Sequence, residues 1–363
     1  MKLLKRGLTI RGDSLYCPLA LSLDSYGNCE ADCHHCYFRR LNYVWGQDLK
    51  PLDIEVFQKT VTNGISNKNP RSALAWALKK KKTVRFGNKA DPFQNAELEH
   101  HASEQVMKIL IQHGWSFMIQ TMFTENMMLH EDLIVDNKDL IVVCPIISPG
   151  AESDWEILER KRTTPIPQRI EHLVRLNRKG VETGVNGEPF IPGYHTVDQF
   201  EDIVKRLKAS GIKSYNTYSF HFNDFVAKRL HNIGIDIEKI WFHNQDKQWK
   251  IILTQLLAIA KKHDLILGCP DFVNSGSHQE RTNTCCGVNV PNPTTFNIIN
   301  WKRGILAGKP PEDVFEESWD GVGDKEEGRE VFLGKSKDMY TLKDCDCFEG
   351  NLFPSKKEGL GFD

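Results

Sequence analysis

The sequence has no long hydrophobic run, no strong excess of charge and no internal repeat. No stretch of about 18 apolar residues occurs in its 363 residues, and a helix that crosses a membrane needs roughly that length. We therefore expect no membrane-spanning helix. The first seven residues resemble the start of a secretory signal, but Arg11 and Asp13 interrupt the apolar stretch that such a signal requires. We expect a cytoplasmic protein.

The balance of charge is close to neutral, with a formal net charge of −1. This excludes a protein that coats nucleic acid through a strongly basic surface, but it permits binding of a nucleotide or a short DNA segment by a local patch. Apolar residues make up 40% and charged residues 26% of the chain, so a sizeable core is expected.

Apolar runs with the length of strands alternate with amphipathic helical patterns, which is typical of βα units around a parallel sheet. Glycines at 114, 180 and 211 follow three of these helical patterns, where a left-handed helix cap favours glycine. We predict an α/β fold, a partial (β/α)6 TIM-type barrel over residues 15–274, after an N-terminal segment (1–14) and before an irregular C-terminal extension (275–363). The six predicted strands are Leu15–Leu23, Thr83–Gly87, Ser116–Phe123, Leu140–Ile147, Val181–Val185 and Ser214–Phe220, and Leu265–Leu267 is a candidate seventh.

Ten cysteines are many for a chain without signs of secretion, and in a reducing compartment they indicate metal binding more often than disulfides. Cys29, Cys33 and Cys36 form a C-x3-C-x2-C pattern directly after the first predicted strand. Three thiolates at this spacing can hold a [4Fe–4S] cluster and leave its fourth iron open for a ligand. The alternative is a zinc site, to which His34 or His35 would add the fourth ligand.

This loop resembles that of the radical S-adenosylmethionine (SAM) superfamily, in which SAM binds the open iron. The residue before the third cysteine is usually aromatic in that superfamily, and His35 takes its place here, where its ring would pack on the cofactor. Two further segments are similar to the spore photoproduct lyase-like branch: DPFQNAE, from Asp91 to Glu97, and the segment from Glu188 to Ile212 that begins EPFIPGYH. The resemblance implies contacts to SAM from Gly87, Asn88, Lys89 and Ser148.

The resemblance also implies an activity. A strongly reducing cluster would cleave SAM to a 5′-deoxyadenosyl radical that abstracts hydrogen from a substrate. The electron would come from a flavodoxin- or ferredoxin-type reductant. A thymine or modified thymine, in DNA or as a nucleotide, is the expected substrate, with a lyase reaction or an isomerase reaction of the kind found in phage thymine modification. Cys144 is a candidate hydrogen donor and Tyr218 a candidate pocket residue.

Other readings of the sequence stay open. A radical SAM enzyme that modifies a peptide or a small metabolite has the same cysteine loop, and a non-catalytic zinc-binding nucleic-acid module accounts for the cysteines without SAM. Five cysteines in the last third of the chain are candidates for a second cluster or a zinc ion, although their spacing matches no accessory-cluster pattern. They are Cys269, Cys285, Cys286, Cys345 and Cys347.

Overall fold

A computed structural model describes most of the first 268 residues and short parts of the remainder. The described residues are 3–5, 7–10, 19, 21–38, 48–70, 73–217, 220–268, 282, 284, 286–293, 304 and 307–318.

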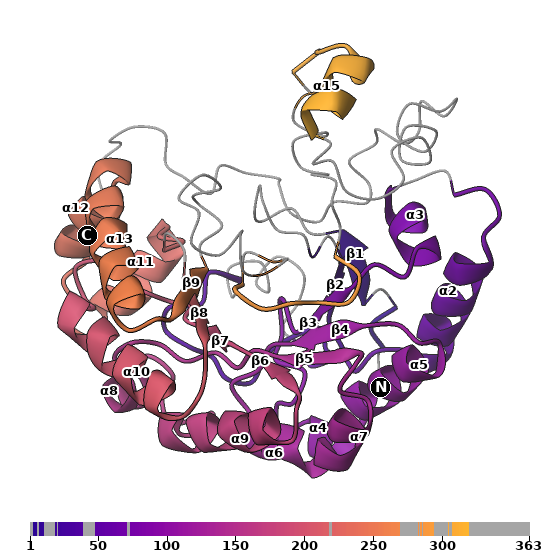
Figure 1. Ribbon diagram of the computed structural model, residues 1–363, viewed down its shortest axis with the longest axis horizontal. Coiled ribbons are helices and arrows are strands. Elements are labelled where there is room, and N and C mark those ends of the chain that lie inside the picture. The colour runs from indigo at the N-terminus through magenta and orange to yellow at the C-terminus, as the bar shows by residue number, and fades with distance from the viewer. Residues whose placement is uncertain are drawn as a thin grey trace.

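In the described residues, nine short strands form a six-stranded and a three-stranded sheet, both mostly parallel, which continue one another as one curved surface (Figure 1). The first six are hydrogen-bonded in chain order, and only β1 runs antiparallel to its neighbour. β6 and β7 are separated only by Gly184, and a bridge between Ile146 and Asn186 joins the end of β5 to β7. The strands are β1 (Leu8–Ile10), β2 (Leu21–Leu23), β3 (Val84–Phe86), β4 (Phe117–Ile119), β5 (Ile141–Val143), β6 (Glu182–Thr183), β7 (Val185–Asn186), β8 (Ser214–Asn216) and β9 (Ile266–Gly268).

The predicted α/β class is confirmed, each of the six predicted strands contains an observed one, and the candidate seventh overlaps β9 at residues 266 and 267. The predicted barrel is not confirmed, because no pairing between described strands connects β9 back to β1 or β2, and the sheet is open. The antiparallel strand β1 occupies the free edge of β2. Its three residues are too short a run to stand out in the sequence, and they fall in the predicted N-terminal segment.

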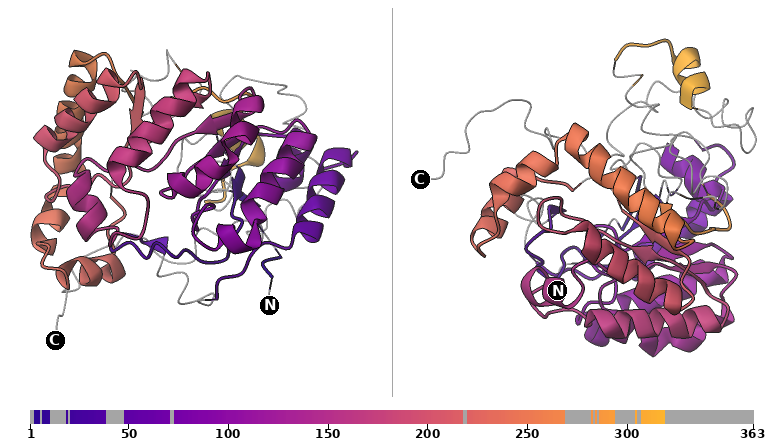
Figure 2. Two further views of the ribbon diagram at one scale, coloured as in Figure 1. Left: turned by 90° about the horizontal axis from the view of Figure 1, so that it is seen from below. Right: turned by 60° about the vertical axis from the view of Figure 1, so that its left-hand side comes forward.

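Helices cover the convex face of the sheet, as both views in Figure 2 also show. No described helix has the length and hydropathy that a membrane span requires. The helices are α2 (Ile54–Ser66), α3 (Ala73–Lys79), α4 (Glu97–His100), α5 (Ala102–Gln112), α6 (Thr124–Met127), the 3₁₀ turn η1 (Met128–His130), α7 (Glu131–Asp136), α8 (Glu152–Ile157), α9 (Ile166–Arg178), α10 (Val197–Ala209), α11 (Asp224–His231), α12 (Ile237–His243) and α13 (Asp246–Lys262), with α15 (Pro311–Ser318) apart from this layer.

Local sequence determines where these helices begin and end. Gly114, Gly180 and Gly211 have φ angles of 58°, 86° and 83°, so they supply the left-handed residues that end α5, α9 and α10. At the start of α10, Thr196 and Gln199 form a reciprocal capping box. These helices therefore stop where the next strand must begin.

Alternate strand residues point to opposite faces of the sheet. On the convex face Val84, Phe86 and their neighbours join the main core under the helices. On the concave face Met118, Val142 and Cys144 form a separate apolar cluster with Leu19 and with Cys286, Val288 and Val290. Residues 286–290 of the predicted C-terminal extension therefore pack against the inside of the sheet.

Candidate active site

A cavity lies beside the cysteine loop, at the ends of β2 to β5. The three cysteines of the motif line it, and so do residues that follow β3, β4 and β5. Its lining includes Cys29, Cys33, His35, Cys36, Tyr37, Gly87, Asn88, Lys89, Asp91, Gln120, Met122, Ile146, Phe220 and His221. Because the carboxyl ends of parallel strands carry the active sites of many α/β folds, this position favours a catalytic role.

None of the three motif cysteines forms a disulfide; Cys33 is buried and the other two are partly exposed. Burial raises the pKa of Cys29 to about 12 and that of Cys33 well above its ordinary value, and the mutual repulsion of the three groups raises both further. Three thiolates gathered here need a compensating positive charge, which the irons of a cluster provide. The donor set therefore fits a cluster.

Within the described part of the chain, no group of three or more His, Cys, Asp or Glu side chains is arranged to hold a metal ion. The cluster and the zinc ion at the motif therefore both stay predictions.

His35 lies in the cavity wall, and its Nδ1 atom is buried without a hydrogen-bond partner. Burial lowers the pKa of His35 to about 3, so the ring is neutral at physiological pH. A neutral aromatic ring is what packing on a cofactor requires, which agrees with the role predicted for it. The role itself stays a prediction.

Asp32, between the first two cysteines, ties the loop to the rest of the fold. Its carboxylate accepts hydrogen bonds from Arg160, Arg162 and Arg229. The backbone N–H of His34 donates to the carbonyl of Leu158 over 2.8 Å. The loop is therefore fastened to α11 and to the segment after α8.

The DPFQNAE segment holds the other end of the loop. The side-chain amide of Gln94 donates to the carbonyl of Asn28 over 2.9 Å and accepts from the backbone N–H of Glu30 over 2.6 Å. Glu30 in turn accepts from the N–H of Ala96 over 2.9 Å. The carboxylate of Glu97 accepts a hydrogen bond from the hydroxyl of Tyr26 over 2.5 Å. The segment that resembles the lyase branch thus fixes the backbone on either side of Cys29.

The turn after β3, residues 87–90, is organised around one buried carboxylate. Asp24, directly after β2, accepts hydrogen bonds from the backbone N–H groups of Asn88, Lys89 and Ala90 over 3.0, 2.7 and 3.2 Å. Burial raises the pKa of Asp24 despite these bonds. Gly87 has a φ of +94°, and a Cβ there would lie 2.3 Å from the carbonyl oxygen of Gln120. Only glycine fits this position without displacing β4.

Asp91 joins this turn to the end of β4. It accepts from the hydroxyl of Thr121 and the N–H of Met122, each over 2.6 Å, and burial raises its pKa to about 6. Met122 contacts the thiol of Cys33, with 3.9 Å between the two sulfur atoms. The turn, the strand end and the cysteine loop are thereby one connected structure.

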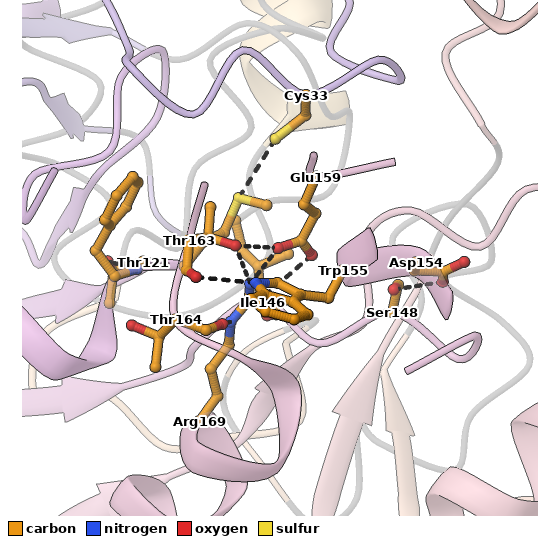
Figure 3. A network of polar contacts seen from close by, with 12 residues as sticks. Cys33, Thr121, Ile146, Ser148, Asp154, Trp155, Glu159, Thr163, Thr164 and Arg169 are labelled. Atoms are coloured by element: carbon orange, nitrogen blue, oxygen red, sulfur yellow. Dashed lines mark hydrogen bonds and ion pairs between the residues drawn. The ribbon is translucent and has the colours of Figure 1, made fainter. Parts of the chain in front are cut away.

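A buried ion pair lies beneath the cavity (Figure 3). Arg169 of α9 pairs with Glu159, and their side chains are 0% and 2% exposed. Arg169 also donates to the carbonyls of Ile146 and Thr164 over 2.7 and 2.6 Å. The N–H of Thr164 donates to the carbonyl of Met122 over 3.0 Å. The pair therefore supports the ends of both β4 and β5.

The remaining predicted site residues lie elsewhere or are not described. Ser148 is buried and donates its hydroxyl to Asp154 over 2.5 Å, and it is not part of the cavity lining. Cys144 belongs to the apolar cluster on the concave face, and burial raises its pKa well above the ordinary value. Tyr218 lies outside the described residues. All three roles stay predictions.

The candidate auxiliary metal ligands receive no support. Cys269, Cys285, Cys345 and Cys347 lie outside the described residues. Cys286 is buried beside Cys144 among apolar side chains.

Sequence reasoning missed Asp24, Gln94 and Gln120, the polar residues that organise or line the cavity. Asp24 and Gln120 each stand just beyond a strand, where parallel sheets carry functional residues, and that position was the available signal. Gln94 was within a recognised segment, but its partners are 64 and 66 residues away.

Comparison with known proteins finds likeness only in structure. No protein-family model matches the sequence, and no curated protein matches it. A solved structure of spore photoproduct lyase complexed with a dinucleoside spore photoproduct is similar over 72% of this chain and 79% of that chain, with a TM-score of 0.53 and 10% identity. A mutant of the same lyase with bound AdoMet and the dinucleoside is similar over 73% and 80%, with a TM-score of 0.54 and 10% identity. The fold relationship predicted from the cysteine loop is confirmed.

Proposed function

We propose, from the fold that the chain shares with spore photoproduct lyase, that it is a radical SAM enzyme whose cluster is held by Cys29, Cys33 and Cys36. One observation carries the proposal: the three cysteines of the motif, none of them in a disulfide, line one cavity at the strand ends of that fold. When bound, the cluster and SAM supply a reductive cleavage that yields methionine and a 5′-deoxyadenosyl radical, with the electron from a flavodoxin- or ferredoxin-type reductant.

The chain's own residues are proposed to orient SAM and to enclose it in the cavity. Asp24 directs the peptide groups of the 87–90 turn, so that Gly87, Asn88 and Lys89 face the cavity with the cysteines. These three residues are proposed to hold the amino-acid part of SAM, and the neutral His35 ring to pack on it. The cavity wall is proposed to keep water from the reactive radical.

For the substrate we propose a thymine or modified thymine, in DNA or as a nucleotide, that undergoes a lyase or isomerase reaction. Two observations support this choice. The similar lyase was solved with a dinucleoside spore photoproduct. In this chain Tyr37, Phe220 and His221 line the cavity, with the rings of Tyr37 and His221 4.4 Å apart. Aromatic side chains of this kind stack on bases.

The cluster is tested by anaerobic reconstitution with iron and sulfide. We expect about four iron atoms per chain, and 5′-deoxyadenosine from SAM and dithionite. Cys33→Ala should lose both, whereas Cys286→Ala, which removes a buried thiol outside the motif, should keep both. A Cys33→Ala protein with full iron content and full SAM cleavage would overturn the proposal, and so would a colourless protein that holds zinc.

The substrate is tested by isotope transfer. Deuterated thymidine, thymidylate and thymine-containing oligonucleotides are incubated with the reconstituted enzyme, SAM and dithionite. We expect deuterium in the 5′-deoxyadenosine from at least one of them. Steady formation of unlabelled 5′-deoxyadenosine with all of them would refute the thymine proposal and direct attention to peptides or small metabolites.

A further inference from the structure

Three buried amide side chains stand on the concave face of the sheet without partners. Gln120 follows β4, and Asn186 and Asn216 belong to β7 and β8. They are 2%, 0% and 3% exposed. Both polar atoms of the Gln120 and Asn186 amides, and Oδ1 of Asn216, have no hydrogen-bond partner. Buried polar groups are nearly always paired, so a set of five unpaired atoms requires an explanation.

The register of the strands brings these groups into neighbouring rows. Asn186 and Asn216 are direct partners across β7 and β8, and Ile146, which lines the cavity, is the bridge partner of Asn186. Gln120 itself lines the cavity beside the cysteine loop. The unpaired amides therefore extend from the candidate active site along the inside of the sheet.

An amide carries a hydrogen-bond donor and an acceptor side by side. Its complement is a planar group that offers an acceptor and a donor at the same spacing, such as the carbonyl and ring N–H of a pyrimidine dione. Pairing of this kind, with two parallel hydrogen bonds, is how Asn and Gln read base edges in nucleic-acid complexes. The concave face nearby carries the apolar side chains of Met118 and Val142 together with Arg85, the register partner of Met118.

We propose that Gln120 binds the imide edge of a pyrimidine dione by a bidentate pair of hydrogen bonds, and that Asn186 and Asn216 continue the polar floor beneath the substrate. This inference rests on the proposed function and specifies which residues recognise the base. Gln120 is two positions beyond Met118 on the same face, and it is next to Cys144 in the register that pairs β4 with β5. A base held there lies between the cysteine loop and the concave face.

The ligand can be varied first, without changing the protein. Equilibrium dialysis measures binding of thymidine and of N3-methylthymidine, which lacks the imide N–H, to the reconstituted enzyme with SAM. We expect the methylated nucleoside to bind about ten- to hundredfold more weakly, which is the range for loss of a bidentate base contact. Equal binding of the two nucleosides, or no binding of thymidine, would overturn the inference.

A second experiment changes Gln120 and repeats the binding measurement. Gln120→Leu should weaken thymidine binding about ten- to hundredfold, with iron content and SAM affinity retained. It should also unfold at a urea concentration no lower than the wild type, because the amide it removes has no partner in the free protein. Gln105→Leu, at an exposed position on α5, is the matched control and should change nothing.

The outcomes separate the two proposals. If the wild type forms no 5′-deoxyadenosine, the proposed function fails. If it forms 5′-deoxyadenosine but Gln120→Leu binds thymidine as the wild type does, only this inference fails. A fall in SAM affinity as large as the fall in thymidine affinity would assign Gln120 to the cofactor and would also refute it.

Discussion

The buried ion pair beneath the cavity should be the most sensitive point of the fold. Replacing Arg169 by methionine keeps much of the side-chain volume but leaves the carboxylate of Glu159 uncompensated at 2% exposure. Breaking such a pair on one side costs about 3–5 kcal/mol. The carbonyls of Ile146 and Thr164 lose their donors as well, so the upper half of this range is expected. For a domain of ordinary stability this is a large fraction of the total.

A matched control lies on the same helix. Arg175 pairs with Glu131, but its side chain is 58% exposed, so Arg175→Met should cost less than about 1 kcal/mol. Urea unfolding of the full chain at pH 7, followed by circular dichroism, measures both variants. Equal losses in the two variants would refute the reasoning, because the buried pair and its two carbonyl contacts should cost more to break than the exposed pair.

The double variant separates the charge from the packing. Adding Glu159→Leu to Arg169→Met removes the stranded carboxylate, and we expect it to restore about 2 kcal/mol of the loss. Recovery should be incomplete because the two carbonyls remain without donors. A double variant less stable than Arg169→Met would mean that Glu159 stabilises the fold through other partners.

Three further outcomes follow from the site. Gly87→Ala should cost about 2–4 kcal/mol in urea unfolding, from the left-handed φ and the close approach to Gln120, and an unchanged midpoint would contradict the turn geometry. Burial by itself raises the pKa of Asp154, but His195 and the hydrogen bond from Ser148 lower it below its ordinary value of 3.8. Its stabilisation is thus present above that value and lost as the pH falls through the lower, folded-state pKa. Asp154→Asn should therefore be about 1–3 kcal/mol less stable at neutral pH, with the gap closing in acid, and a gap that widens in acid would refute the sign. Gln94→Leu should speed proteolytic cleavage of the cysteine loop, whereas cleavage at the wild-type rate would show that the loop is held elsewhere.

Most of the secondary structure could be predicted because local rules decide it. The helical pattern before Gly211 is observed as α10, which is bounded by its capping box and that glycine. The helical pattern before Gly114 is broken at His101, whose φ is 50°. No Gly or Pro marks that break, so no local signal predicts it.

The candidate site was predictable only where residues cluster in the sequence. Three cysteines within eight residues form a recognisable pattern. Asp24, in contrast, acts on backbone groups 64 to 66 residues away, and Glu159 and Arg169 are recognisable as partners only once both are known to be buried. Closure of the sheet depends on pairing between the most distant strands, about which periodicity contains no information.

The clamp that Gln94 and Glu30 form on either side of Cys29 consists entirely of protein atoms. Many small metal-binding domains are unfolded until the metal arrives, because nothing else orders their ligands. Here the backbone around the first thiol is held by the side chains of Gln94 and Glu30. We therefore predict that the iron-free protein keeps this loop folded, and limited proteolysis of the chain before and after treatment with a chelator measures it.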